Sequence, residues 1–242
     1  MTKAVAAAVD RHPHLAGPVR QGWVRVDMHS HTMWSGDATT TPEEVVQAVA
    51  DSGIDVLCVT DHSSVVGAHH LAAMSDAGGL ACRVVVGIEA RTWAGEIIGL
   101  FLSERPDPGL KPADLARSIR DQGGLVYVPH PFDPLRNCLR PEILDELVAD
   151  GLIDIVEVLN AKTSLASLNA KADDFARVHG LLRGAGSDAH VPAAVGAAYV
   201  EMPDFTDAGS FATALESAVV VGHYFDPPRP WKARIVPSTR SF

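Results

Sequence analysis

Hydrophobic and polar positions alternate in blocks along most of this chain. Short apolar runs, typical of strands covered on both faces, separate longer stretches that have helical periodicity. The apolar runs predict strands at 23–28, 54–60, 82–89, 96–102, 125–130, 153–160, the first part of 181–190, and 197–202. The periodic stretches predict helices at 41–53, 65–77, 111–124, 140–151, 164–180 and 207–218. About seven such alternations predict a parallel sheet with helices outside, as a (β/α) barrel or a doubly wound sheet.

Local signals support two of these elements. In the helix 41–53, Thr41 is suited to the N-cap, Pro42 to the first helical position and Gly53 to the end. The run "ARTWAG" at 90–95 predicts a turn that leads into a paired strand.

No break in composition divides the chain, so we expect one domain over residues 23–225. Residues 1–22 are expected to form an N-terminal arm, and the Pro-rich, basic residues 226–242 a tail against the body.

The net charge, the apolar runs and the cysteines limit the partners and the cellular location that we expect for this chain. The formal net charge of −10 argues against broad electrostatic binding to nucleic acid or to anionic membranes. No uncharged stretch approaches the ~18 residues that a membrane span needs, and the apolar run near the N-terminus is too short for a signal peptide. Three cysteines without regular spacing are a poor disulfide framework. We therefore expect a soluble cytoplasmic protein without a stable nucleic-acid partner; the oligomeric state stays open.

Side chains that bind metals follow one predicted strand after another. The motifs are "DMHSH" (27–31) with Asp37 beyond it, "TDH" (60–62), "GIE" (87–89), "PHP" (129–131) and "GSDAH" (186–190). In parallel α/β folds the ligand site lies beyond the carboxyl ends of the strands. A lone His is more often a surface or core residue, but five such strand ends predict a metal site.

The types of side chain in these motifs indicate which metal ions the site would bind. Imidazoles with carboxylates and no cysteine suit Zn²⁺, Mn²⁺ or Fe²⁺, whereas Mg²⁺ or Ca²⁺ favour carboxylates alone. Roughly eight or nine candidate ligands exceed what one tetrahedral ion needs, so two or three carboxylate-bridged metals are expected. Two metals roughly 4 Å apart can hold a phosphate and activate water, which favours hydrolysis of phosphate esters.

This ordered set of motifs resembles the PHP family, named for polymerases and histidinol phosphatase, over about residues 23–202. The resemblance implies a distorted (β/α)₇ TIM-like barrel that binds three ions of Zn²⁺, Mn²⁺ or Fe²⁺. It also implies phosphoester hydrolysis, with attack by a metal-bridging hydroxide in a di- or trinuclear site. The acidic charge favours a small phosphorylated metabolite, a nucleotide or a short oligonucleotide as substrate.

The resemblance further implies a role for each motif residue. The first metal is expected to take His29, His31, Glu89 and Asp188. Glu89 would bridge to a second metal that also takes His130, and a third would take Asp37, His62 and His190. Asp27 is expected to support a ligand from behind.

One position departs from the family pattern. Many members carry a further His on the strand after the "GIE" motif, but here that strand reads "EIIGLFL". If Gly99 matches the glycine of the family, Glu96 takes the place of that His as a ligand of the second metal. The alternative is that Glu96 is a solvent-facing turn residue and the second site is absent or weakly filled.

Four cations, Arg91, Arg136, Arg140 and Lys162, lie just beyond strand ends. Because Arg is suited to bidentate phosphate contact, we expect Arg136 above all, and also Arg91 and Lys162, to bind the substrate. The alternative for each is a solvated loop cation.

Other functions stay open at this point. His190 or Asp188 are candidates for proton transfer to the leaving oxygen, although both are also expected ligands. A histidinol phosphatase is possible, but nothing selects an imidazole-bearing substrate. A non-catalytic PHP scaffold would show a degenerate ligand set. A C–N hydrolase would more often use a bridging Lys, and Lys162 is close to the motifs.

Overall fold

The computed structural model describes residues 18–163 and 165–229. Most of the expected arm and of the expected tail lies outside these residues. The strands are β1 (Trp23–Ser30), β2 (Val56–Val59), β3 (Arg83–Thr92), β4 (Gly95–Leu100), β5 (Leu125–Val128), β6 (Ile155–Asn160), β7 (Leu182–Gly186), β8 (Ala198–Pro203) and β9 (Val219–Gly222). The helices are α1 (Pro42–Ser52), α2 (Val66–Asp76), α3 (Pro112–Asp121), α4 (Pro141–Ala149), α5 (Ala166–His179) and α6 (Ala208–Leu215). Short 3-10 turns lie at Met33–Ser35 and Pro192–Ala194.

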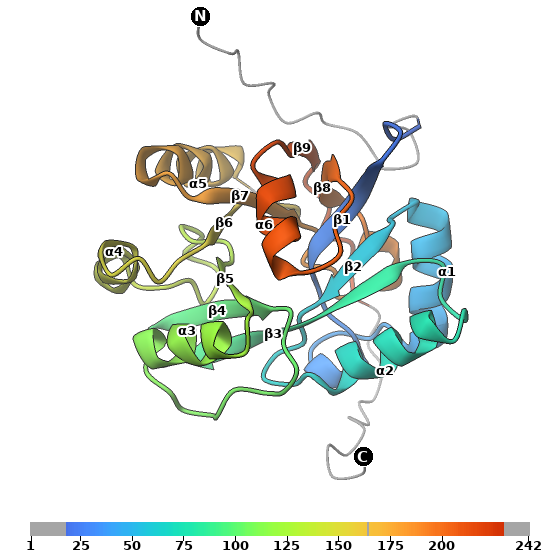
Figure 1. The fold of residues 1–242 in the computed structure, drawn as a ribbon, viewed down its shortest axis with the longest axis horizontal. Coiled ribbons are helices and arrows are strands. Elements are labelled where there is room, and N and C mark those ends of the chain that lie inside the picture. Colours follow the sequence, from blue (N-terminus) through green and yellow to red (C-terminus); the bar gives the residue numbers. More distant parts are fainter. Residues whose placement is uncertain (1–17, 164, 230–242) are drawn as a thin grey trace, which may run out of the picture.

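The strands form one sheet in the order β7-β6-β5-β4-β3-β2-β1-β8-β9. Neighbours are parallel except that β4 is antiparallel to β3 and β5, and β8 is antiparallel to β1 and β9. Helices α1 to α5 surround the sheet, and α6 crosses in front of it (Figure 1). No helix among the described residues is long and apolar enough to cross a membrane.

Two segments share the edge of β1 and nearly close the sheet into a barrel. The first half of β1 pairs with β8, from Trp23 opposite Pro203 to Val26 opposite Val200. Beyond that point, the segment that follows β7 takes over. Asp188 N donates to His29 O at 2.8 Å, and His31 N donates to Ala189 O at 2.9 Å. This closure places the residues after β7 beside the end of β1.

The inside of the barrel is filled by side chains. Met28 and Tyr127 are fully buried, and both lie against Gly184 of β7. A Cβ at Gly184 would stand 2.9 Å from Tyr127 Cε2 and 3.0 Å from Met28 Cε, so a larger residue would not fit without displacing them. The packed interior forms the floor beneath the carboxyl ends of the strands, where the polar residues gather.

The predicted α/β barrel class is confirmed, but a regular count of seven strand–helix units is not. A hairpin joins β3 to β4 without a helix, and the antiparallel strands β8 and β9 complete the sheet. The sequence did not predict β9. Its four residues follow α6 closely, and the helical pattern over 207–218 extended past the observed helix end at Leu215.

Other elements agree with the sequence to within a few residues. Helix α1 has the expected Thr41 N-cap, with a capping box in which Glu44 N donates to Thr41 Oγ1 and Thr41 N donates to Glu44 Oε2. Strand β3 runs to Thr92 rather than Glu89, because Arg91 and Thr92 pair with Glu96 and Gly95 in the hairpin.

Candidate metal centre

The strand-end motifs meet in one buried cluster. His29 lies in β1 and Glu89 in β3, while His31 directly follows β1, His130 follows β5 and Asp188 follows β7. His29 Nε2 and His31 Nε2 are 3.0 Å apart, and Asp188 Oδ1 lies 3.4 Å from His31 Nε2. These atoms are close enough together to hold one cation.

Glu89 lies at the centre of the cluster. Its Oε1 is 3.1 Å from His130 Nε2, and its Oε2 is 3.5 Å from His29 Nε2 and 3.3 Å from His31 Nε2. Glu89 forms one candidate site with His29 and His130, and a different one with His62 and Glu96. A carboxylate in this position can bridge two cations.

A further group lies toward the surface. Asp37 Oδ2 is 3.3 Å from His62 Nε2 and 3.4 Å from His190 Nε2. His31 joins this group, with its ring centroid 4.3 Å from that of His190 and 4.7 Å from that of His62. The structure thus brings together the three residues expected around the third metal and adds His31 to them.

Glu96 points into the cluster. It is 3% exposed, its Oε1 lies 3.7 Å from His62 Nδ1, and its Oε2 lies 3.9 Å from His130 Nε2. Burial rules out the solvent-facing turn residue considered from the sequence. Its role as a ligand stays a prediction.

Several buried atoms in the cluster lack the hydrogen bonds that their burial requires. His62 Nδ1 lies 3.1 Å from Glu89 Oε2, yet within residues 18–163 and 165–229 it forms no hydrogen bond. Asp37 Oδ1 and His130 Nδ1 also lack hydrogen-bond partners among the described residues. Buried polar groups are normally satisfied, and divalent cations bind imidazole and carboxylate groups of this kind. The donor set therefore fits divalent metal ions.

The charges of the cluster also suit metal binding. Burial and the nearby His31 lower the pKa of His190 to about 4, so its ring is neutral at neutral pH, the form that binds metals. Burial opposes ionisation of Glu89 and Asp188, but the surrounding histidines hold the pKa of both carboxyls well below the ordinary value. Burial lowers the pKa of His31, but its hydrogen bonds to Asp188 and Glu89 outweigh this effect and raise it to about 9. A bound cation would replace that proton.

The carboxylate of Asp27 lies behind the cluster and accepts hydrogen bonds from the backbone of residues around it. Asp27 is fully buried, and burial raises its pKa to about 6. It accepts hydrogen bonds from the backbone N–H of Ser187 at 2.9 Å, of Gly196 at 2.9 Å and of His29 at 3.3 Å. Asp27 thus supports the ligands through the backbone rather than through a ring nitrogen.

Sequence reasoning missed two supporting carboxylates. Glu157 Oε1 lies 3.0 Å from His29 Nδ1, and Glu157 Oε2 accepts from His130 N at 2.7 Å. Asp61 accepts from both the N–H and the hydroxyl of Thr32, each at 2.6 Å. The signal for Glu157 was an acidic residue with apolar neighbours on both sides in the predicted strand "IDIVEVLN". Asp61 lay within a motif of which only the His had been considered.

The backbone is constrained at two of the candidate ligands. His130 has φ 29° and Asp188 has φ 49°, values that non-glycine residues rarely adopt. Such conformations persist where surrounding contacts enforce them and gather at functional sites. Nearby, a Cβ at Gly186 would stand 2.3 Å from His29 Cβ, so only glycine lets β7 approach His29 so closely.

The three cations expected to bind substrate border the cluster. Lys162 is buried, with Nζ 3.1 Å from His190 Nδ1 and 3.4 Å from Asp188 Oδ1. Arg136 places a terminal nitrogen 3.4 Å from Asp188 Oδ2, and Arg91 Nε lies 3.0 Å from Glu96 Oε1. Arg140 instead lies over the ring of Trp93, 5.2 Å from its centroid.

Fold and site together define an α/β barrel protein with a His and carboxylate centre for several metal ions. The chain belongs to the PHP family, since the PHP domain model matches residues 27–181. A second model, described as PHP-associated, matches residues 166–220. The resemblance drawn from the motifs is therefore confirmed.

Other proteins are similar to this chain in sequence or in fold. Uncharacterized protein MJ1587 of Methanocaldococcus jannaschii is 36% identical over 148 residues, which are 57% of this chain and 82% of that protein. A two-domain protein of Bacteroides vulgatus "containing predicted PHP-like metal-dependent phosphoesterase" superposes with a TM-score of 0.68 at 19% identity, covering 92% of this chain and 70% of that one. Endonuclease Q in complex with a 27-mer duplex containing an abasic lesion has a TM-score of 0.62 at 15% identity, covering 83% and 60%. At these identities the two structures show a shared fold alone.

Proposed function

We propose that this protein hydrolyses a phosphoester of a small substrate, with two or three divalent cations held by the cluster. The observation that carries the proposal is the sharing of donors between neighbouring groups. Glu89, His29, His31 and His62 each belong to two of the four candidate sites. Shared donors place cations close together, as required to hold the attacking and leaving oxygens of one phosphate.

The proposed ligands are the nine residues of the motifs and the following strand. They are His29, His31, Asp37, His62, Glu89, Glu96, His130, Asp188 and His190. When bound, Zn²⁺, Mn²⁺ or Fe²⁺ would polarise the phosphate and lower the pKa of a coordinated water. The mixture of imidazole and carboxylate favours these metals over Mg²⁺ or Ca²⁺.

Residues of the chain would orient the phosphate. Arg136 and Lys162 contact Asp188 through different oxygens, Oδ2 and Oδ1, so their cationic groups border the same part of the cluster. Both can donate hydrogen bonds to phosphate oxygens and stabilise charge that develops during the reaction. The low pKa of His190 favours a role as a metal ligand over a role as a general acid. We propose that Asp188 and His190 both act mainly as metal ligands.

Charge favours a small substrate. Endonuclease Q, which shares the fold, is seen bound to duplex DNA, whereas this chain has a net charge of −10. Since nucleic-acid affinity depends on neutralising many phosphates, we propose a phosphorylated metabolite, a nucleotide or a short oligonucleotide. A non-catalytic scaffold is disfavoured because the donor set is nearly complete.

The test is a hydrolysis panel with metal-stripped protein to which Mn²⁺, Zn²⁺ or Fe²⁺ is added. The panel includes mononucleotides, bisphosphates, sugar phosphates, histidinol phosphate, short RNA and duplex DNA. The His29→Ala variant should lose at least about a hundredfold in kcat/KM, because even groups behind a metal ligand cost 10–100-fold.

His179→Ala is the matched control. His179 is an exposed histidine at the end of α5 that packs on Phe175 and belongs to none of the candidate sites. It should retain wild-type activity. Equal activity in the wild type and the His29→Ala variant would exclude the proposed site.

A further inference from the structure

The loop between β1 and α1 carries a serine that contacts two of the proposed ligands. Ser35 ends the 3-10 turn Met33–Ser35, four residues after His31. Its Oγ lies 3.0 Å from Nδ1 of His31, and it accepts a hydrogen bond from the backbone N–H of His62 at 3.1 Å. One hydroxyl therefore connects the segment that follows β1 to the segment that follows β2.

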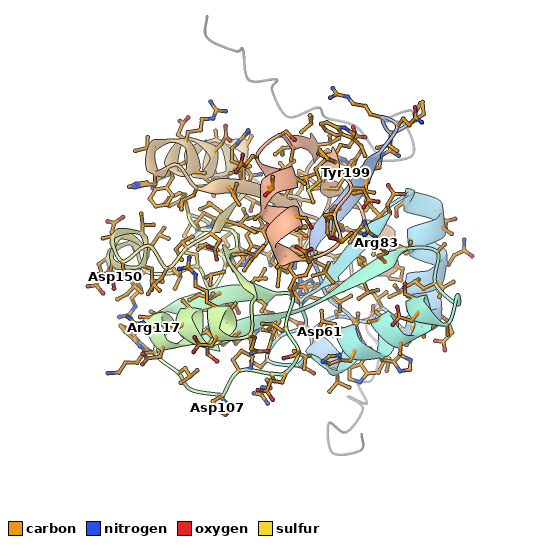
Figure 2. The ribbon with its side chains drawn as sticks, viewed as in Figure 1. Asp61, Arg83, Asp107, Arg117, Asp150 and Tyr199 are labelled. Atoms are coloured by element: carbon orange, nitrogen blue, oxygen red, sulfur yellow. The ribbon has the colours of Figure 1, made fainter. Side chains whose placement is uncertain are left out.

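Contacts with the rest of the barrel hold this loop in place. Asp61, which follows β2 and faces α2 (Figure 2), accepts hydrogen bonds from the N–H and the hydroxyl of Thr32, and Ser35 N donates to Thr32 O at 2.9 Å. Helix α2 packs directly against this pair, since a Cβ at Gly67 would overlap Asp61 Oδ2 and stand 2.7 Å from Thr32 Oγ1. The turn ends at Gly36, whose φ of 79° favours glycine. The position of Ser35 is thus fixed by contacts other than those of its hydroxyl with the two histidines.

The two ring nitrogens of His31 have different surroundings. Its Nε2 lies 3.3 Å from Glu89 Oε2 and 3.4 Å from Asp188 Oδ1, whereas its Nδ1 lies at Ser35. A neutral imidazole that gives Nε2 to a cation carries its proton on Nδ1 and can donate it in a hydrogen bond. The hydroxyl oxygen of Ser35 has two lone pairs, so it can accept from His31 and from His62 N–H at the same time.

The two histidines of the first motif are held by different groups. Nδ1 of His29 faces the carboxylate of Glu157 at 3.0 Å, whereas Nδ1 of His31 faces a neutral hydroxyl. A hydroxyl can orient a ring without adding charge to the cluster. With Nδ1 in this contact, His31 has one nitrogen left for a cation, although it belongs to two of the candidate sites.

We propose that Ser35 is a positioning residue of the metal centre. Its hydroxyl keeps Nε2 of His31 directed at Glu89 and Asp188, and it holds His62 through the backbone. The inference rests on the proposed metal-dependent function and adds a residue that itself binds neither metal nor substrate. It implies that His31 binds a single cation, through Nε2.

Nuclear magnetic resonance of the Zn²⁺-loaded wild type tests the orientation of the ring. Zn²⁺ is diamagnetic, so proton–nitrogen correlations of the imidazole rings show which nitrogen carries a proton. His31 should bind Zn²⁺ through Nε2 and carry on Nδ1 a proton that exchanges slowly with water. Binding of Zn²⁺ through Nδ1 would overturn the proposal, and this measurement needs no variant.

Ser35→Ala tests the hydroxyl itself, because it removes the oxygen and little volume. Competition with a chelator should show a loss of about 10–100-fold in Zn²⁺ affinity, the range expected for partners behind a metal ligand. The proton on Nδ1 of His31 should then exchange rapidly with water.

Ser75→Ala is the matched control. Ser75 Oγ donates to Cys82 O at 2.7 Å, and Ser75 lies at the opposite end of α2 from Gly67. It should keep the Zn²⁺ affinity of the wild type. Equal Zn²⁺ affinities of Ser35→Ala and Ser75→Ala would overturn the proposal.

Failure of this inference differs from failure of the proposed function. Hydrolysis by the wild type, together with an unchanged Zn²⁺ affinity in Ser35→Ala, would reject the role of Ser35 and keep the enzyme. A Zn²⁺ affinity that depends on Ser35, in a protein that hydrolyses no phosphoester, would keep the role of Ser35 and reject the enzyme.

Discussion

Glu157 is a buried carboxylate that organises the candidate metal centre by contacting two of its histidines. It is fully buried, and its Oε1 lies 3.0 Å from His29 Nδ1. Its Oε2 accepts from His130 N at 2.7 Å and from Asn160 Nδ2 at 3.0 Å. A carboxylate at Nδ1 favours a proton on that nitrogen and leaves Nε2 of His29 free to bind a cation.

We therefore predict that Glu157→Gln lowers the affinity for Mn²⁺ or Zn²⁺ by about 10–100-fold, as loss of such outer partners does. Competition with a chelator measures the affinity. The matched control is Glu201→Gln in β8, where Glu201 pairs with Arg25 at 3.0 Å and belongs to no candidate site. Unchanged metal affinity in Glu157→Gln would contradict the role given to Glu157.

Residue identity alone did not show whether Glu96 is a turn residue or part of the buried site. A Glu at the start of an apolar strand is equally compatible with a turn and with a buried site. The strand register places Glu96 at the buried site, because Glu96 pairs with Arg91 across the hairpin and so faces the same side of the sheet as Glu89. Alternation along β3 places Glu89 and Arg91 on one face.

At the scale of elements, the helix ends were predicted best where their signals are local. Thr41, Pro42 and Gly53 bound α1 as expected. Helix α6 begins with a second capping box, in which Asp207 accepts from Ser210 N at 2.8 Å. This backbone hydrogen bond holds the pKa of the exposed Asp207 carboxyl below its ordinary value of 3.8.

The Asp207 cap predicts that the free energy of unfolding depends on pH. Because the folded-state pKa of Asp207 is lowered, its charge stabilises the fold above the unfolded-state pKa, and the contribution disappears as the pH falls through the folded-state pKa. Asparagine caps helices about as well as aspartate but carries no charge. Asp207→Asn should therefore lower the free energy of unfolding at neutral pH, and its difference from the wild type should shrink below pH 3.8.

Urea unfolding from about pH 7 to about pH 3 measures this difference. Asp145→Asn is the control, since Asp145 is exposed within α4 and occupies no capping position. A difference between Asp207→Asn and the wild type that stays constant over this range would show that the charge of Asp207 does not stabilise α6.

At the scale of the molecule, the metal centre joins parts of the barrel that are far apart in sequence. The proposed ligands come from β1, β3 and β4 and from the segments that follow β1, β2, β5 and β7. Since the cations need this folded arrangement, their binding should stabilise the whole domain.

We predict that Mn²⁺ or Zn²⁺ at a hundred times its Kd adds about 2.7 kcal/mol to the free energy of unfolding. For a domain of this size the gain corresponds to a rise in Tm of roughly 5–10 °C. Differential scanning calorimetry with and without a chelator measures it, and His29→Ala should lose most of the rise. The proposed centre is wrong if metal leaves the Tm of the wild type unchanged.

The sequence by itself determined the class of fold and most of the candidate site. Strand and helix periodicities are local, so alternating blocks predicted the barrel class. Parallel strands expose their carboxyl ends at one edge of the sheet, so residues that follow successive strands had to meet. The chemistry of imidazoles and carboxylates then indicated a metal site, and the order of the motifs indicated the family.

Only the tertiary structure decided which groups surround that site. Glu157 and His29 are 128 positions apart, and no local pattern relates them. The burial of Glu96 and the pairing of β1 first with β8 and then with the segment after β7 also depend on distant segments. Periodicity shows which face of an element is buried, but what that face meets is set by how the whole chain packs.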